Sequence, residues 1–213
     1  MKILVTAFDP FENEPVNPAF EAVKKLPDKI NDNEIIKLEI PTSFKRSEEA
    51  IKNAIEKHSP DVILSIGQAG GRNEITLEKV AINFLEARIK DNDGYQPSNL
   101  PIKEDGENAY FTNLNIKGIV AYLKENKIPA AISYTAGTFV CNSVMYNNLY
   151  LVNKKYPNIK TGFIHVPYLP EQAALKNPIP SSMSIETIEK GIELAIEAII
   201  LNKNSKDIMG NTH

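Results

Sequence analysis

AAISYTAGTFVCNSVMYNNLYLVNKKYPNIKTGFIHVP, residues 130–167, contains the strand, helix and strand that decide the fold. AAISYTAG (130–137) and GFIHVP (162–167) are short apolar runs that predict buried strands, and NSVMYNNLYLVNKK (142–155) between them predicts a helix. Two strands joined by one helix pair in parallel, because the chain must cross back over the sheet before the second strand begins. The segment therefore predicts an α/β unit with its helix on one face of a parallel sheet.

The same alternation continues toward both ends of the chain. Further strands are predicted at 2–7, 35–40 and 61–67, and further helices at 17–26, 47–58, 115–127 and 184–200. Asn17 followed by Pro18 is a typical helix start, and Pro27 is a helix stop. The sequence predicts one α/β domain over residues 1–213, with a twisted, largely parallel (mixed) central sheet and helices on both faces.

Residues 68–114 interrupt the alternation. They show no clear helical pattern and are rich in Gly, Asn, Asp and Pro, so they predict loops and additional strands. A long irregular segment inside a compact domain is often functional, because the rigid elements around it hold its side chains in place. The residues leave the conformation of 85–114 open.

Composition narrows the class of protein. Hydrophobic residues make up 42% and charged residues 24% of the 213 residues, as is typical of a globular protein with a sizeable core. The 24 basic and 27 acidic residues give a formal charge of −3 without a basic patch, so we expect no nucleic-acid partner. No apolar run reaches membrane-spanning length, and MKILVTAFDP lacks the features of a signal peptide. With only one cysteine, the sequence predicts a cytoplasmic protein without an intramolecular disulfide or a membrane partner.

The residues that follow the predicted strands form a candidate site. Ligands in open α/β sheets bind near the carboxyl ends of the strands. The segments in this position are FDPFENEP, GQAGGRNE, TAGTFVCNS and FIHVPYLPEQ. We expect them to converge on one edge of the sheet.

Cys141 is the only cysteine in the chain and has two interpretations. It would lie at a helix start with His165 on a neighbouring strand end, and both surroundings favour a thiolate nucleophile. The alternative is an inert core thiol, because free cysteine is among the most buried residue types. His165 in turn is either a catalytic base or a hydrogen-bonded core histidine. The two other histidines, His58 at a helix end and His213 at the C-terminus, are predicted to be bystanders.

A catalytic triad also needs a group that orients the imidazole. The acidic candidates in the irregular segment are Glu74, Glu78, Glu86 and Asp91. Glu78 is flanked by apolar residues in EITLEKVAINF, which favours a carboxylate on a partly buried strand, whereas an ordinary surface position is the alternative. The residues alone leave this choice open.

The glycines of GQAGGR (67–72) suggest a rival function. They could form a tight turn whose backbone N–H groups bind phosphate, as in a nucleoside- or phosphate-binding enzyme. The specific patterns GxxxxGKS/T and GxGxxG are absent there, so a structural turn is the simpler interpretation. A binding module without catalytic activity is a further alternative. Three histidines without close spacing and one cysteine give no metal-binding pattern, so we expect no metal.

Three longer segments, GQAGGRNEITLEKVAIN, SYTAGTFVCNSVMYN and GFIHVPYLPEQ, resemble the pyroglutamyl peptidase I family, also called pyrrolidone carboxyl peptidases. The likeness is collinear from LVTAFDPF near the N-terminus to the PEQ segment. It implies a cysteine exopeptidase that hydrolyses the N-terminal pyroglutamyl residue from peptides through an acyl-enzyme, with Cys141 as nucleophile, His165 as base and Glu78 as the orienting residue. The resemblance also implies a phosphorylase/hydrolase-like α/β fold, no cofactor and a homotetramer.

The resemblance extends to substrate binding. Pyroglutamate is a flat, uncharged lactam, which suits an apolar slot. The residues matched to this slot, or adjoining it, are Phe8, Phe11, Gln68, Phe139 and Val140. Ordinary core packing is the alternative for the aromatic rings. The backbone N–H of Cys141 and the side chain of Arg88 are the implied oxyanion donors.

The chain departs from the family pattern mainly in its first loop. Relatives commonly read GFxPFGG where this chain reads AFDPFEN, so that Ala7, Glu12 and Asn13 replace glycines. We expect a changed loop shape and hence a changed affinity for substrate. Lys79 replaces the usual Arg after Glu78, which is a conservative change.

Overall fold

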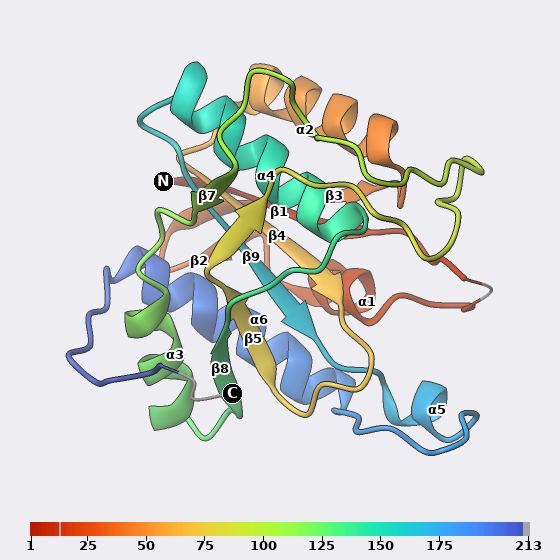
Figure 1. Cartoon of the computed structure of the whole chain (residues 1–213). Coiled ribbons are helices and arrows are strands. Elements are labelled where there is room, and N and C mark those ends of the chain that lie inside the picture. Colours follow the sequence, from red (N-terminus) through yellow and green to blue (C-terminus); the bar gives the residue numbers. More distant parts are fainter. Residues whose placement is uncertain (13, 211–213) are drawn as a thin grey trace.

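The computed structural model describes residues 1–12 and 14–210, and its central feature is a seven-stranded sheet in the order β2-β3-β1-β4-β9-β5-β8 (Figure 1). Its strands are β1 (Lys2–Phe8), β2 (Lys29–Ile30), β3 (Asn33–Ile40), β4 (Val62–Gln68), β5 (Ile75–Glu78), β8 (Ala130–Ser133) and β9 (Lys160–Val166). The strands β3, β1, β4 and β9 are parallel, and β5 is parallel to β8. The antiparallel pairs are β2 with β3 and β5 with β9. The sheet is therefore mixed and mainly parallel, as the sequence predicts.

Helices cover both faces of this sheet. One face packs against α1 (Pro18–Lys25), α3 (Ile116–Glu125) and α6 (Ile185–Ile200), and the other packs against α2 (Phe44–His58) and α4 (Val140–Lys154). Figure 1 shows α2 and α4 above the sheet, with α3 and α6 below it. The short helix α5 (Pro170–Ala173) follows β9. This arrangement confirms the predicted α/β class with helices on both faces.

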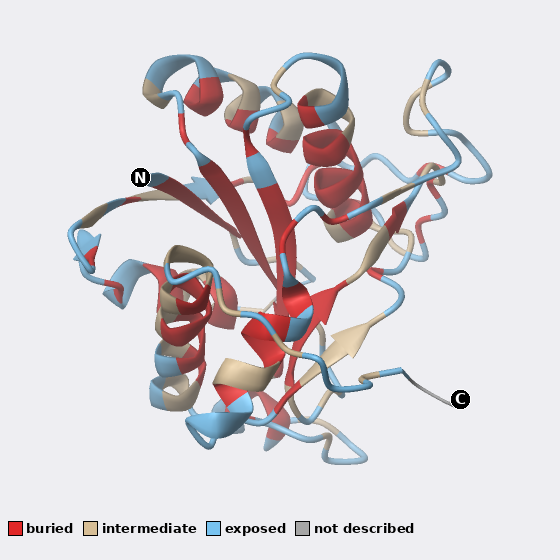
Figure 2. Cartoon of the chain, turned by 90° about the vertical axis from the view of Figure 1, so that its left-hand side faces the viewer, coloured by how far each residue is buried: buried red, intermediate tan, exposed pale blue. Residues whose placement is uncertain are grey.

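Strand β1 shows how the sequence supplies both cores. Ile3 and Val5 belong to the hydrophobic cluster beneath α1, α3 and α6. Leu4 and Phe8 belong to the cluster beneath α2 and α4. The alternation follows from the two-residue period of a strand, and both sets are buried because helices cover both faces of the sheet (Figure 2).

The predicted strand at 130–137 ends earlier than its apolar pattern suggests. Only β8 (Ala130–Ser133) pairs with β5. Ser133 Oγ then accepts a hydrogen bond from the Thr135 N–H at 3.3 Å, and Gly137 has a φ of +79°. A side-chain-stabilised turn therefore replaces the second half of the predicted strand and leads the chain into α4.

Residues 68–114 contain no helix, as the sequence predicts. They contribute β5 to the main sheet and form a separate two-stranded sheet from β6 (Val80–Ile82) and β7 (Ala109–Phe111). The elements β2 and α5 were not predicted because, at two and four residues, they are too short to show a periodic pattern. In the part of the chain that the structure describes, no helix combines the length and the apolar character needed to cross a membrane.

Candidate active site

Cys141 is the second residue of α4 and lies against the end of β4. A Cβ atom added to Gly67 would stand 3.1 Å from Sγ of Cys141 and 2.9 Å from the ring of Phe163. Glycine at this position therefore allows the close approach of α4 to the strand. Gly67 is also the register partner of His165 in the β4–β9 pairing. The fold thus brings the predicted nucleophile and base to the same end of the sheet.

His165 and Glu78 form a buried hydrogen-bonded pair. Nδ1 of His165 lies 2.7 Å from Oε1 of Glu78, and the two residues are 3% and 0% exposed. Thr76 lies opposite His165 in the antiparallel pairing, so Glu78 reaches the imidazole from a diagonal position. An ionised carboxylate can only accept, so Nδ1 carries the proton and Nε2 can accept one from a thiol. Glu78 therefore lies on a buried strand and not at the surface.

The Glu78 carboxylate has a second partner that sequence reasoning missed. Nη1 of Arg72 donates to the same Oε1 at 2.6 Å and also contacts the hydroxyl of Thr76. Nη2 of Arg72 donates to the carbonyl oxygen of Thr135 at 3.1 Å. Oε2 of Glu78 is buried and has no hydrogen-bond partner among the described residues. The imidazole and the guanidinium thus both hold this carboxylate through one oxygen.

The turn in GQAGGR explains how Arg72 reaches Glu78. Gly71 has a φ of +88°, and a Cβ atom at Gly70 would collide with the ring of Tyr168. The N–H of Ala69 donates to the carbonyl of Val166 at 2.9 Å, and the N–H of Arg72 donates to the carbonyl of Ala69 at 3.4 Å. These contacts support the structural turn over a phosphate-binding loop.

The surroundings set the charge of these groups at rest. Burial raises the pKa of the Cys141 thiol to about 12, and the Glu78 carboxylate adds to the effect. Burial also lowers the pKa of His165 below its ordinary value, against the opposing hydrogen bond to Glu78. Burial acts to raise the pKa of Glu78, but the hydrogen bond and charge of His165 and the charge of Arg72 make the net shift downward. The resting site therefore favours a neutral thiol, a neutral imidazole and a carboxylate over a preformed thiolate.

A narrow pocket lies beside the thiol. Its lining contains Cys141 and every residue of the predicted slot: Phe8, Phe11, Gln68, Phe139 and Val140, together with Asn17 and Thr42. The ring centroids of Phe11 and Phe139 are 6.4 Å apart, and those of Phe139 and Phe44 are 5.4 Å apart. Sequence reasoning missed Asn17 and Thr42 as lining residues. The sequence explains Asn17 as a helix cap, which gives no reason to expect it in a binding pocket. Thr42 follows the predicted strand at 35–40, whose end is not among the four segments expected to form the site.

Arg88 lies outside this lining. Its side chain is 81% exposed, and its Nη2 lies 3.4 Å from Oε1 of Glu12. Glu12 has a φ of +54°, in the left-handed region that favours glycine. Ala7 is buried in β1, and Asn13 lies outside the described residues. The departure from the family pattern at Glu12 therefore gives Arg88 a partner away from the pocket.

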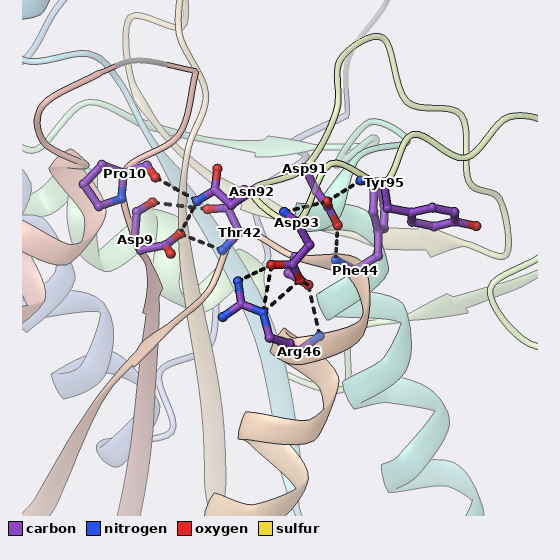
Figure 3. Close-up of polar contacts among 10 residues, drawn as sticks. Asp9, Pro10, Thr42, Phe44, Arg46, Asp91, Asn92, Asp93 and Tyr95 are labelled. Carbon is purple, nitrogen blue, oxygen red and sulfur yellow. Dashed lines mark hydrogen bonds and ion pairs between the residues drawn. The ribbon is translucent and has the colours of Figure 1, made fainter.

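Hydrogen bonds connect the loop around Asp91 with its surroundings, which include Thr42 of the pocket lining (Figure 3). Asp91 is 6% exposed, and its carboxylate accepts from the N–H groups of Phe44 at 3.0 Å and Tyr95 at 2.9 Å. Nδ2 of Asn92 donates to the carbonyl of Pro10 at 2.9 Å. These bonds join the loop to the start of α2 and to the first loop. Asp91 therefore holds this loop in place, while Glu78 is the acidic residue that contacts His165.

The remaining candidates lie away from the imidazole. Glu86 accepts from the N–H of Asn99 at 2.6 Å, Glu74 precedes β5, and His58 is the last residue of α2. His213 lies outside the described residues. Among residues 1–12 and 14–210, no group of three or more His, Cys, Asp or Glu side chains could hold a metal ion.

A thiol, an imidazole and a carboxylate brought together at one end of an α/β sheet are typical of a cysteine hydrolase. The model of the pyroglutamyl peptidase family matches residues 1–202. A pyrrolidone-carboxylate peptidase of Clostridium perfringens is 58% identical over 210 residues, which cover 99% of this chain and 98% of that protein. The protein of that name from Enterococcus faecalis is 55% identical over 212 residues, which cover 100% and 99% of the two chains.

Solved structures show the same fold. The crystal structure of pyroglutamyl peptidase I from Bacillus amyloliquefaciens has a TM-score of 0.93 and 45% identity, covering 97% of this chain and 98% of that one. A mutant pyrrolidone carboxyl peptidase from the hyperthermophile Pyrococcus furiosus has a TM-score of 0.92 and 39% identity, covering 95% and 99%. The chain belongs to the pyroglutamyl peptidase family, which confirms the resemblance seen in its motifs. It is an enzyme of the cysteine-type omega peptidase class.

Proposed function

We propose that this chain hydrolyses the N-terminal pyroglutamyl residue from peptides, with Cys141 as nucleophile, His165 as general base and Glu78 as orienting residue. One observation carries the proposal: a pocket lined by aromatic rings reaches Cys141, at the sheet end where His165 and Glu78 are hydrogen-bonded. The relatives, which are named as pyrrolidone-carboxylate and pyroglutamyl peptidases, support the same activity.

The resting charge state supports general-base catalysis. As Sγ of Cys141 attacks the pyroglutamyl carbonyl outside the ring, the thiol proton passes to Nε2 of His165. The Glu78 carboxylate stabilises the imidazolium that forms. The imidazolium then protonates the leaving amine as the C–N bond breaks, which leaves a thioester. Water, losing its proton to His165, hydrolyses the thioester and releases pyroglutamate and the free thiol.

The start of α4 can stabilise the oxyanion of each step. The helix begins after Phe139, whose phenyl side chain offers no acceptor to the first-turn N–H groups. The N–H of Cys141 belongs to that turn, where the helix dipole favours negative charge. Arg88 is the second proposed donor. To act, it must leave Glu12 and turn toward the pocket.

The pocket suits an uncharged ring. Nε2 of Gln172 donates to Oε1 of Gln68 at 3.4 Å, so the NH₂ group of Gln68 is the donor that a lactam carbonyl would meet. Opening the lactam to glutamate adds an ammonium and a carboxylate, and burial of unpaired charge costs several kcal/mol. Prolyl peptides lack the lactam carbonyl and carry a charged ring nitrogen. We therefore expect both to be poor substrates.

We also propose that the enzyme is a cytoplasmic homotetramer that needs no cofactor, on the strength of the family resemblance. Leu175 and Ile179 are 89% and 73% exposed, and they offer apolar surface to another copy of the chain. Light scattering from the purified protein tests the assembly. A tetramer has four times the 23.7 kDa mass of one chain.

Release of a chromophore from a pyroglutamyl anilide, by folded and reduced protein without added metal, tests the activity. We expect the wild type to turn over this substrate. For glutamyl and prolyl anilides kcat/KM should be lower by several orders of magnitude, where each factor of ten corresponds to about 1.4 kcal/mol in activation free energy. Cys141→Ala is expected to fold and lose essentially all turnover. No release by the wild type, or turnover retained in Cys141→Ala, would contradict the proposal.

A further inference from the structure

Arg72 connects the segments that carry the proposed triad. It lies on the turn between β4 and β5 and contacts Glu78 and Thr76, both on β5. It also contacts Thr135, on the turn that leads to the nucleophile. Thr76 is the register partner of His165 on β9. One side chain therefore fixes the carboxylate relative to the strand of the imidazole and to the entry of α4.

The geometry requires the fork of a guanidinium. Oε1 of Glu78 accepts both the 2.6 Å bond from Nη1 of Arg72 and the 2.7 Å bond from Nδ1 of His165. At the same time Nη2 reaches the carbonyl of Thr135 at 3.1 Å, whereas a lysine ammonium is a single point of charge. Arg72 lines a separate hollow beside β8, away from the described lining of the substrate pocket. Its contacts therefore point to the catalytic pair and not to the substrate.

Arg72 also balances the charge that faces His165. The charged groups that act on the imidazole are Glu78 on β5 and Arg72 on the turn, and Cys141 on α4 lies beside Gly67, the register partner of His165. Burial is the largest cause that lowers the pKa of His165, and the charge of Arg72 lowers it further, whereas Glu78 raises it. The guanidinium thus offsets part of the carboxylate charge and helps to keep the imidazole neutral, as a proton acceptor must be.

We propose that Arg72 is a positioning residue of the catalytic site. Its guanidinium holds the Glu78 carboxylate against His165 and offsets the negative charge of that carboxylate. The proposal rests on the proposed function, because this role affects turnover only if His165 is the base. It concerns a residue that acts through Glu78 and does not touch the substrate.

Arg72→Gln removes both the charge and the fork. We expect kcat to fall on the order of tenfold to a hundredfold, because the base loses its fixed position, with little change in KM. The acidic limb of kcat/KM should move to higher pH. Without the guanidinium the imidazolium is stabilised, so the pKa of His165 rises and a higher pH is needed to obtain the neutral base.

Arg72→Lys separates charge from geometry. It keeps a cation beside Glu78 but cannot also bind the carbonyl of Thr135, so the acidic limb should stay near that of the wild type while kcat recovers only in part. Lys190→Gln is the matched control. It removes an exposed cation that pairs with Glu193 within α6 at 3.0 Å, and it should behave as the wild type.

An NMR titration of the His165 ring provides a measurement that does not depend on turnover. The pKa of His165 should be higher in Arg72→Gln than in the wild type or the Lys190→Gln control. An unmoved His165 titration in Arg72→Gln, or wild-type kcat in that variant, would overturn the proposal. If Arg72→Gln does not fold, Arg72→Lys decides, because wild-type kcat in it would refute the need for the fork. If the wild type releases no pyroglutamate, the proposed function fails, while the titration still tests Arg72.

Discussion

Two Arg–Glu pairs in this chain have the same chemistry in opposite surroundings. Arg72 meets Glu78 at 2.6 Å, and these side chains are 26% and 0% exposed. Arg88 meets Glu12 at 3.4 Å, and these side chains are 81% and 48% exposed. The inner pair joins a glycine turn to a strand of the central sheet, whereas the outer pair joins two loops.

This difference in solvent exposure decides what each pair can do. An exposed ion pair contributes about 0–1 kcal/mol, because water and salt screen it. Removing one partner of a buried pair costs more, about 3–5 kcal/mol, because a charge is left without compensation. The inner pair is therefore suited to hold the Glu78 carboxylate in one place. The outer pair can open readily, as Arg88 must if it is to reach an oxyanion.

The largest expected effect comes from Glu78→Gln, which breaks the inner pair at its shared oxygen. The amide keeps the shape of the side chain but removes the charge that stabilises the imidazolium. We expect kcat to fall on the order of a thousandfold, with a smaller change in KM, as steady-state kinetics on a pyroglutamyl anilide will show. Glu12→Gln breaks the outer pair in the same way and should stay within about fivefold of the wild type. Equal effects of the two substitutions would remove the distinction between the pairs.

An intermediate effect concerns the alkylation of Cys141 by iodoacetamide. Burial raises the pKa of this thiol to about 12, so little thiolate exists at neutral pH and labelling should be slow. The labelling rate should keep rising as the pH passes about 8.5, the ordinary pKa of a cysteine, and should show no plateau there. Glu78→Gln removes a carboxylate that raises this pKa, so labelling should become faster at a given pH. Glu12→Gln should leave the rate unchanged. Fast labelling of the wild type with a plateau below pH 8.5 would instead indicate a preformed thiolate.

Most of the fold could be predicted from the sequence because its strands and helices carry regular apolar patterns. The strand–helix–strand pattern around Cys141 and the strand that contains Gly67 place the predicted nucleophile and base at one end of the sheet. The pairing of β5 between β9 and β8 could not be predicted, because a four-residue strand does not specify its neighbours. That pairing brings Glu78 to His165, so the residues alone left several acidic candidates open.

The contacts of the two arginines show the limit of sequence reasoning in another way. Arg72 occurs within the glycine turn whose backbone N–H groups suggest a phosphate-binding loop. Its partner, Glu78, is six residues away on the next strand. Only the turn geometry, with Gly71 at a φ of +88°, directs this side chain to Glu78. Arg88 was matched to the oxyanion through the family pattern. Its position also depends on Glu12, a residue in which this chain departs from that pattern.

The smallest expected effect comes from Glu12→Gly, which restores the usual residue of the family at the outer pair. Glu12 has a φ of +54°, a conformation that costs a residue with a side chain about 1 kcal/mol and costs glycine little. Relief of this strain exceeds the loss of a screened ion pair. We therefore expect Tm to rise by about 1–3 °C, since 1 kcal/mol corresponds to about 2–4 °C in a chain of this size.

Glu12→Ala is the matched control, because it removes the same carboxylate but keeps a Cβ atom at the strained position. Its Tm should not exceed that of the wild type.

Both variants release Arg88 to the same extent, so both should show the same rise in kcat/KM. The rise should be at most about fivefold, because the ion pair is worth up to about 1 kcal/mol. High salt should remove this advantage over the wild type, because it screens the outer pair in the parent enzyme. A rise in Tm for Glu12→Ala equal to that for Glu12→Gly would show that the carboxylate, and not the backbone, is the source of strain. An unchanged kcat/KM in both variants at low salt would show that Glu12 does not restrain Arg88 during turnover.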